Sequence, residues 1–277
     1  MKRIYRSIKL LSLSILILPT AANAAIDLDF SGYIGGSQPD QALTGTNTVY
    51  DGLTGLFYND VADEDTTGIY IIARLEAVSA YTAANTSANG RTGTNIQVNQ
   101  AANNGLTSYR LSLYDGLTGN LFTNGGSSFE FDLVIYDIDG TGNVESIGLE
   151  TFTILTPASF QLTDTTTVAF DGSNSFSNGG AGAEVSNPTT NDLDATQEDA
   201  SVILSFMNQN IVNFNFTTAG NGSGGRNFFI DGQDFVVFDD ALSTGINNGS
   251  IVPEPSAYAF LLGLVVLGIA TTRRSVV

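Results

Sequence analysis

The sequence predicts an all-β protein, an antiparallel β-sandwich of jelly-roll-like type. Apolar and polar residues alternate over several short runs, and no long stretch carries apolar residues at helical spacing. Clusters of Gly, Asn, Asp and Ser separate the runs at the intervals expected of a sandwich. Hydrophobic residues make up 42 % of the 277-residue chain, with 17 Phe and 10 Tyr, so there is enough apolar material for a core.

Residues 1–24 are predicted to be a secretory signal peptide. A basic start is followed by the apolar run 10–18, which Pro19 ends, and Ala22-Asn23-Ala24 fits a small-x-small cleavage motif. We therefore expect cleavage between Ala24 and Ala25. The alternative is an uncleaved anchor, which the short apolar run disfavours because a spanning helix needs about 20 residues.

Residues 25–246 are predicted to form the sandwich domain. Its clearest strand is 129–136, where Phe129, Phe131, Leu133 and Ile135 occupy every second position. Further strands are expected within 68–81, 107–114, 147–155, 160–170, 202–206, 212–216 and 227–238. Long polar loops are expected near 38–48, 83–94, 172–198 and 219–226.

A short motif occurs twice in this domain. Tyr-Asp-Gly-Leu-Thr-Gly stands at 50–55 and again at 114–119, and each copy leads to a phenylalanine. Asp-Gly is a turn dipeptide, and the flanks of the two copies differ. We therefore expect two similar turns, with an ancient duplication as the alternative.

The predicted mature body is strongly acidic. Between Ala25 and Val252 it has four Arg, no Lys and 27 acidic residues, which leaves a net charge of −23. Such a body repels nucleic acid and anionic lipid and attracts divalent cations. The chain has no Cys and no His, so thiolate chemistry and the usual catalytic triads are excluded, and any metal site must use oxygen ligands.

One loop has the composition of a calcium site. Asp137, Asp139, Thr141 and Asn143 alternate through a glycine-rich stretch that follows the clearest strand, and Glu145 comes next. Ca²⁺ takes six to eight oxygens, which such loops supply. The start resembles an EF-hand loop, but Gly148 stands where the bidentate Glu belongs and no helices flank the loop. The alternative is a solvated hairpin stabilised by Asx-turns.

Two further acid clusters could add ligands if they fold against this loop. The first contains Asp60, Asp63, Glu64 and Asp65, and the second contains Asp192, Asp194, Glu198 and Asp199. Each is also what an ordinary charged loop looks like.

Catalysis and sugar binding are the alternatives to a structural role. Glu145 and Glu150 resemble part of the strand motif of jelly-roll glucanases, but Ile147 replaces its middle acid, and residues five apart on a regular strand face opposite sides. A carbohydrate-binding module could instead use tyrosine faces for stacking. The candidate tyrosines are Tyr50, Tyr58, Tyr81, Tyr109 and Tyr114.

The C-terminal part carries a sorting pattern. A linker is expected at 247–252, followed by Pro253-Glu254-Pro255, an apolar segment at 257–270 and the pair Arg273-Arg274. The segment predicts a short membrane helix with its basic end on the cytoplasmic side. A plain single-pass anchor after a proline-rich hinge is the alternative.

This order resembles the PEP-CTERM sorting signal of Gram-negative bacteria, over residues 253–277. The resemblance implies that an exosortase recognises Pro253, Glu254 and Pro255 and cleaves the tail. It also implies that the membrane helix holds the protein until processing, after which the body passes to the cell surface or extracellular matrix. We thus expect a non-enzymatic exported protein, stabilised by Ca²⁺ and associated with exopolysaccharide or biofilm. A carbohydrate-binding module of the envelope and a jelly-roll glycosidase are the alternatives.

Overall fold

The computed structural model describes residues 24–36, 38–44, 50–62, 69–102, 105–139, 144–149, 159–172, 174–178, 193–219, 224–232 and 246–250. Most of the predicted signal peptide and the whole predicted sorting tail lie outside these ranges. Within them, no helix is both long enough and apolar enough to cross a membrane.

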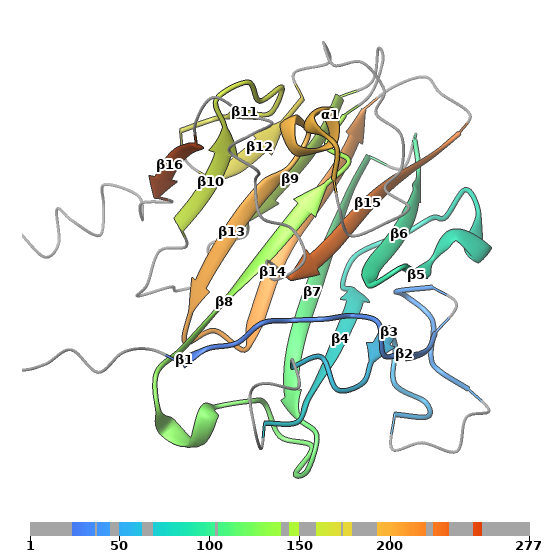
Figure 1. The fold of residues 1–277 in the computed structure, drawn as a ribbon. Helices are drawn as coiled ribbons and strands as arrows, with labels where there is room; N and C mark the ends of the chain where they lie inside the picture. Colours follow the sequence, from blue (N-terminus) through green and yellow to red (C-terminus); the bar gives the residue numbers. More distant parts are fainter. Residues whose placement is uncertain are drawn as a thin grey trace, which may run out of the picture.

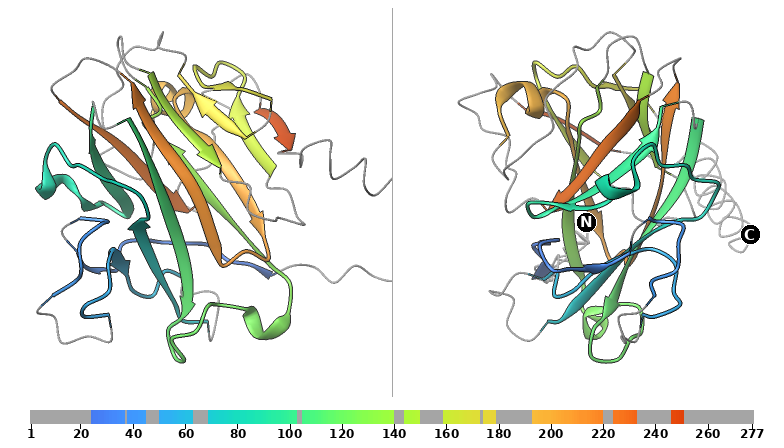
Figure 2. Two further views of the ribbon diagram at one scale, coloured as in Figure 1. Left: turned by 180° about the vertical axis from the view of Figure 1, so that it is seen from behind. Right: turned by 90° about the vertical axis from the view of Figure 1, so that its right-hand side faces the viewer.

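The described residues form two eight-stranded sheets that lie one over the other (Figures 1 and 2). Sheet 1 contains β1 (Ala24–Ala25), β5 (Gly90–Thr92), β6 (Asn95–Ala101), β8 (Phe129–Tyr136), β10 (Ser159–Thr163), β13 (Val202–Met207), β15 (Gly225–Gly232) and β16 (Ile246–Ser250). Sheet 2 contains β2 (Tyr33–Gly35), β3 (Leu56–Tyr58), β4 (Ile71–Ala77), β7 (Gly105–Asp115), β9 (Val144–Leu149), β11 (Ala169–Phe170), β12 (Ser175–Ser177) and β14 (Ile211–Ala219). The helical elements are α1 (Ala195–Asp199) and the 3₁₀ turns η1 (Thr86–Ala88) and η2 (Asn124–Gly126).

The chain alternates between the two sheets. Sheet 1 has the order β16-β10-β13-β8-β15-β6-β5, and sheet 2 has the order β11-β12-β9-β14-β7-β4-β3-β2. From β6 to β10, and again from β12 to β15, each strand lies in the sheet opposite to the strand before it. Pairing is antiparallel except between β1 and β8. The predicted antiparallel β-sandwich is therefore confirmed.

Aromatic rings join the two sheets at the core. Phe228 of sheet 1 packs edge-on against Tyr109 of sheet 2, with ring centroids 5.2 Å apart, and lies 4.7 Å from the ring of Phe216. Tyr109 in turn stacks on Phe214 at 5.4 Å. All four side chains are at most 1 % exposed, which follows from the period-two pattern that points alternate residues inward.

The N-terminal segment closes one end of the sandwich. The predicted cleavage-site residues Ala24 and Ala25 form β1 and pair with Phe129 and Glu130. The chain then buries Leu28. A Cβ on Gly232 would lie 1.9 Å from the carbonyl oxygen of Leu28, so the segment can pass here only because residue 232 is glycine.

The predicted strands are largely where the sequence places them, but three polar stretches differ. The expected loop 83–94 contains η1 and β5, and the expected loop 172–198 contains β12 and α1. The expected linker 247–252 overlaps β16, an edge strand that pairs with β10 from Ile246 to Ser250. The strands β12 and β16 owe their order to pairing with residues distant in sequence, which local composition does not reveal.

Candidate functional site

The outer faces of the two sheets differ in exposure. On sheet 1, Val134, Tyr136, Ile203 and Phe229 point away from the core and yet are at most 1 % exposed. On sheet 2, whose strands β7 and β14 face the viewer in Figure 2 (left), the outward residues of these two strands are mostly small or polar and only partly buried. The exposed polar face of sheet 2 is therefore the better candidate for binding a large ligand.

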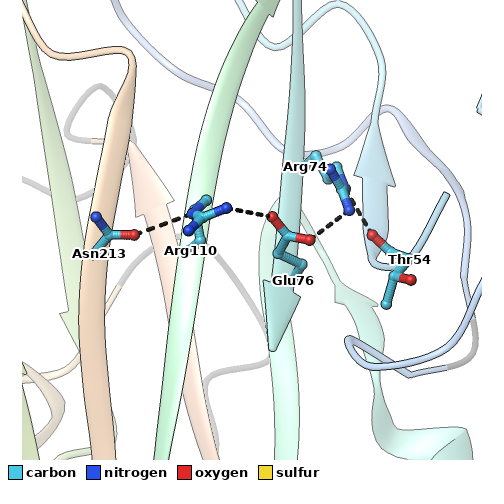
Figure 3. Close-up of polar contacts among 5 residues, drawn as sticks. All are labelled: Thr54, Arg74, Glu76, Arg110 and Asn213. Carbon is cyan, nitrogen blue, oxygen red and sulfur yellow. Dashed lines mark hydrogen bonds and ion pairs between the residues drawn. The ribbon is translucent and has the colours of Figure 1, made fainter. Parts of the chain in front are cut away.

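A ladder of polar side chains crosses this face (Figure 3). Asn213, Arg110 and Glu76 lie directly opposite one another on β14, β7 and β4. Arg110 donates to Asn213 Oδ1 at 3.3 Å and to Glu76 Oε1 at 3.4 Å. Glu76 also accepts from Arg74 at 2.5 Å, and Arg74 Nε donates to the carbonyl of Thr54 at 2.6 Å. We call these five residues the sheet 2 ladder.

The ladder is a cationic spot on an acidic protein. Two guanidinium groups share the single carboxylate of Glu76, whose side chain is 13 % exposed. Arg110 is 44 % exposed, and its two ladder contacts are long. A guanidinium has five N–H donors, so Arg110 retains donors that can turn toward a ligand.

Tyrosines border the ladder. Tyr114 lies opposite Ile72 on the same face, and Tyr50 stacks on Phe57 with ring centroids 5.2 Å apart. Tyr70 comes two residues before Ile72, and its hydroxyl donates to the side chain of Asn59. Tyr50, Tyr70 and Tyr114 are half-buried, so parts of their surfaces remain accessible beside the polar ladder.

The two copies of the repeated motif meet at Tyr70. Burial raises the pKa of Tyr50 in the first copy, and the neighbouring Tyr70 acts in the same direction. In the second copy, a Cβ on Gly116 would lie 2.2 Å from the ring of Tyr70. The third residue of the motif is left-handed at Gly52, with φ +87°, whereas Gly116 has no such positive φ. The copies thus have similar sequences but different backbones.

Three of the five candidate stacking tyrosines belong to the core, so the expectation that they face sugar is wrong. Tyr58, Tyr81 and Tyr109 are 0 %, 9 % and 0 % exposed. Their hydroxyls donate hydrogen bonds within the protein. Tyr58 donates to the carbonyl of Gly90, Tyr81 to that of Asn99 at 2.6 Å, and Tyr109 to Gln100 Oε1 at 3.0 Å. Strand periodicity cannot distinguish an inward tyrosine from an outward one until the register is known.

The predicted calcium loop lies partly within the described residues. Asp137 and Asp139 follow β8 and are buried, at 8 % and 4 % exposure, and Asp137 has the left-handed φ of +70°. Thr141 and Asn143 lie outside the described residues, as does Glu150, and Glu145 is placed on β9 by its backbone. Across the described ranges, no three Asp or Glu residues form a group that could hold a metal ion.

Two residues of the second acid cluster, Asp194 and Asp199, stabilise local structure through hydrogen bonds. Ile138 N–H donates to the carbonyl of Ala200 at 3.0 Å, which brings α1 beside the end of β8. Asp194 caps α1 and accepts from Thr196 and Gln197, and these hydrogen bonds, led by the Thr196 hydroxyl, lower its pKa. Asp199 accepts from the hydroxyls of Thr163 and Thr165, each at 2.6 Å. Asp192 of this cluster, and Asp63, Glu64 and Asp65 of the first, lie outside the described residues.

The sequence did not single out the sheet 2 ladder. Its one visible signal is the scarcity of basic residues: the predicted body has four arginines, and two of them stand in this ladder. The predicted sorting residues Pro253, Glu254, Pro255, Arg273 and Arg274 lie outside the described residues, the motif beginning three positions after β16 ends at Ser250.

The architecture places the described residues in the class of two-sheet β-sandwich proteins. No protein-family model matches the chain, and no curated protein matches it. Among solved structures, it is similar to the glucan-binding protein C of Streptococcus mutans, with a TM-score of 0.39 and 13 % sequence identity. That similarity covers 67 % of this chain and 62 % of the other, so it spans less than two thirds of the neighbour's length.

Proposed function

We propose that the protein is a non-enzymatic exported component of the cell surface or extracellular matrix of a Gram-negative bacterium, where it associates with exopolysaccharide or biofilm. The observation that carries the binding role is the sheet 2 ladder, which lies on the same polar sheet face as half-buried Tyr114. The alternative, a carbohydrate-binding module of the envelope, restricts this role to direct binding of carbohydrate.

The chemistry of the face suits sugar hydroxyls. Each hydroxyl both donates and accepts, and the ladder offers guanidinium donors, a carboxylate acceptor and an amide that does both. Neighbouring strands lie about 4.8 Å apart, so groups on adjacent strands repeat at a spacing comparable to the length of one sugar ring. The bordering tyrosines can pack against the apolar faces of the rings.

The sequence of the two ends of the chain supports export and sorting to the cell surface. We propose that residues 1–24 direct export and that an exosortase-type enzyme processes the tail 253–277, whose apolar helix holds the protein in the membrane until then.

We also propose a jelly roll: in the central strands, the orders β6-β15-β8-β13 and β7-β14-β9-β12 interleave as the chain alternates between sheets.

The sorting proposal predicts a processing defect. Changing Pro253, Glu254 and Pro255 together to alanine should leave the full-length chain in the membrane fraction of an exosortase-bearing host. Fractionation and intact-mass measurement of the C-terminus check this. Ser256→Ala is the control and should be processed like the wild type. Equal processing of the triple variant would show that the motif is not what the enzyme reads.

The ladder proposal predicts a local loss of affinity. Arg110→Ala should weaken binding to the producer's own exopolysaccharide about tenfold, because it removes charge-assisted hydrogen bonds. Affinity electrophoresis measures this. Arg91→Ala on sheet 1 changes the net charge equally and should bind like the wild type. Equal weakening by both variants would indicate a charge effect without a site, and shortening of the polysaccharide during incubation would favour the glycosidase alternative.

Calcium stabilisation stays part of the proposal. The predicted ligands are Asp137, Asp139, Thr141, Asn143 and Glu145, and support comes from the burial of the first two at the end of β8.

A further inference from the structure

A second group of oxygen ligands gathers on the outer face of sheet 1. Ile230 of β15 pairs with Ile96 of β6, and both belong to the core. Asp231 and Asn95 are the next residues of the two strands, so by strand alternation both point to the outer face. Thr94 Oγ1 donates to Asp231 Oδ2 at 3.0 Å.

The polar atoms of this group are buried and incompletely satisfied. Asn95 is 1 % exposed, and neither its Oδ1 nor its Nδ2 has a hydrogen-bond partner. Asp231 is fully buried, and its partners are the Thr94 hydroxyl and the N–H of Gly232. An amide buried with both ends unsatisfied is costly, and an ion or a water in contact with it would remove that cost.

The N-terminal segment brings a second carboxylate. Phe30 N–H donates to the carbonyl of Thr94 at 3.1 Å, so Asp29 lies beside the start of β6. Burial, with the negative charge of Asp29 acting in the same direction, raises the pKa of Asp231 to about 8. The carboxylate of half-buried Asp29 accepts from the N–H and the hydroxyl of Ser31, at 2.6 and 2.9 Å. A cation beside the two carboxylates would offset their repulsion and the burial of Asp231.

We propose that Asp29, Thr94, Asn95 and Asp231 form a calcium site, separate from the loop at 137–145. The donors are two carboxylates, an amide oxygen and a hydroxyl, which is the oxygen set that Ca²⁺ takes. Water retained by the ion would accept from Asn95 Nδ2. A single water without the ion would satisfy the amide but would not offset the negative charge of the two carboxylates. The ion would fasten the N-terminal segment to β6 and β15.

Isothermal titration of the EDTA-stripped protein with CaCl₂ tests the site. Asp231→Asn should bind one calcium ion fewer per chain than the wild type. This variant should fold, since it replaces a buried carboxyl with a neutral amide of the same size. Asp139→Asn, in the predicted loop, should retain the ion that Asp231→Asn loses.

Terbium luminescence sensitised by tyrosine gives a second readout of the same ion. Equal calcium stoichiometry in the wild type and in Asp231→Asn, including zero in both, would overturn the proposal. Loss of the same ion in Asp139→Asn would also overturn it, because the site would then not be separate. A failure of exopolysaccharide binding leaves this result unaffected, since the ladder lies on the other sheet.

Discussion

Gly232→Ala should lower the free energy of unfolding by about 3 kcal/mol, because the new methyl group has no space. It would lie 1.9 Å from the carbonyl oxygen of Leu28 and 2.7 Å from its carbonyl carbon. These are backbone atoms, so the clash cannot be relieved by rotating a side chain, and the N-terminal segment must shift. Urea unfolding followed by tyrosine fluorescence measures the loss.

Gly224→Ala is the matched control for this variant. Gly224 lies just before the same strand, has no atom within 4 Å of its ideal Cβ and has no positive φ. It should therefore change stability by less than about 0.5 kcal/mol. A similar stability for the two alanine variants would show that the N-terminal segment does not pass over Gly232.

Phe228→Ala should cost about 3–5 kcal/mol, the range for removing a buried phenylalanine ring. The ring is fully buried and contacts Tyr109, Phe214 and Phe216 of the opposite sheet. Its removal opens a cavity at the interface between the sheets. The midpoint of urea unfolding should fall while the denaturant slope stays unchanged.

Two further variants make the measurement of Phe228 specific. Phe228→Leu retains most of the volume and should cost about 1.5 kcal/mol. Leu106→Ala removes a side chain that is 54 % exposed on β7 and should be nearly neutral. A loss below about 1 kcal/mol for Phe228→Ala would mean that this ring does not join the sheets.

The strands with alternating apolar residues could be predicted, because the alternation within each strand identifies the face that will be buried. The strand β6 could not, since Ile96 and Val98 alone mark its inner face. Its outer face is held by amides: Asn99 donates to Asn227 Oδ1 at 2.8 Å and accepts from the backbone of Asn85. Those partners are distant in sequence, so a stretch rich in Asn and Gln is easily taken for a loop.

The helix α1 shows a signal that periodicity misses. Five residues are too few to display a helical repeat, yet Asp194 and Gln197 have the spacing of a capping box, and both of its hydrogen bonds are present. The sheet 2 ladder has no comparable motif in the local sequence. Arg110 meets Glu76 and Asn213 only because three strands share one register, and register is a property of the folded sheet.

The alternation of successive strands between the sheets also bears on how the chain reaches its fold. Neither sheet can be completed from one contiguous stretch, so the entropy of closing long loops is lost before most pairings can form. Sandwiches of this kind fold in milliseconds to seconds, whereas an isolated hairpin forms in about 1–10 μs. During that interval apolar strands are exposed. The net charge of −23 on the predicted body then has a kinetic benefit, because mutual repulsion keeps unfinished chains apart while each one completes its own sheets.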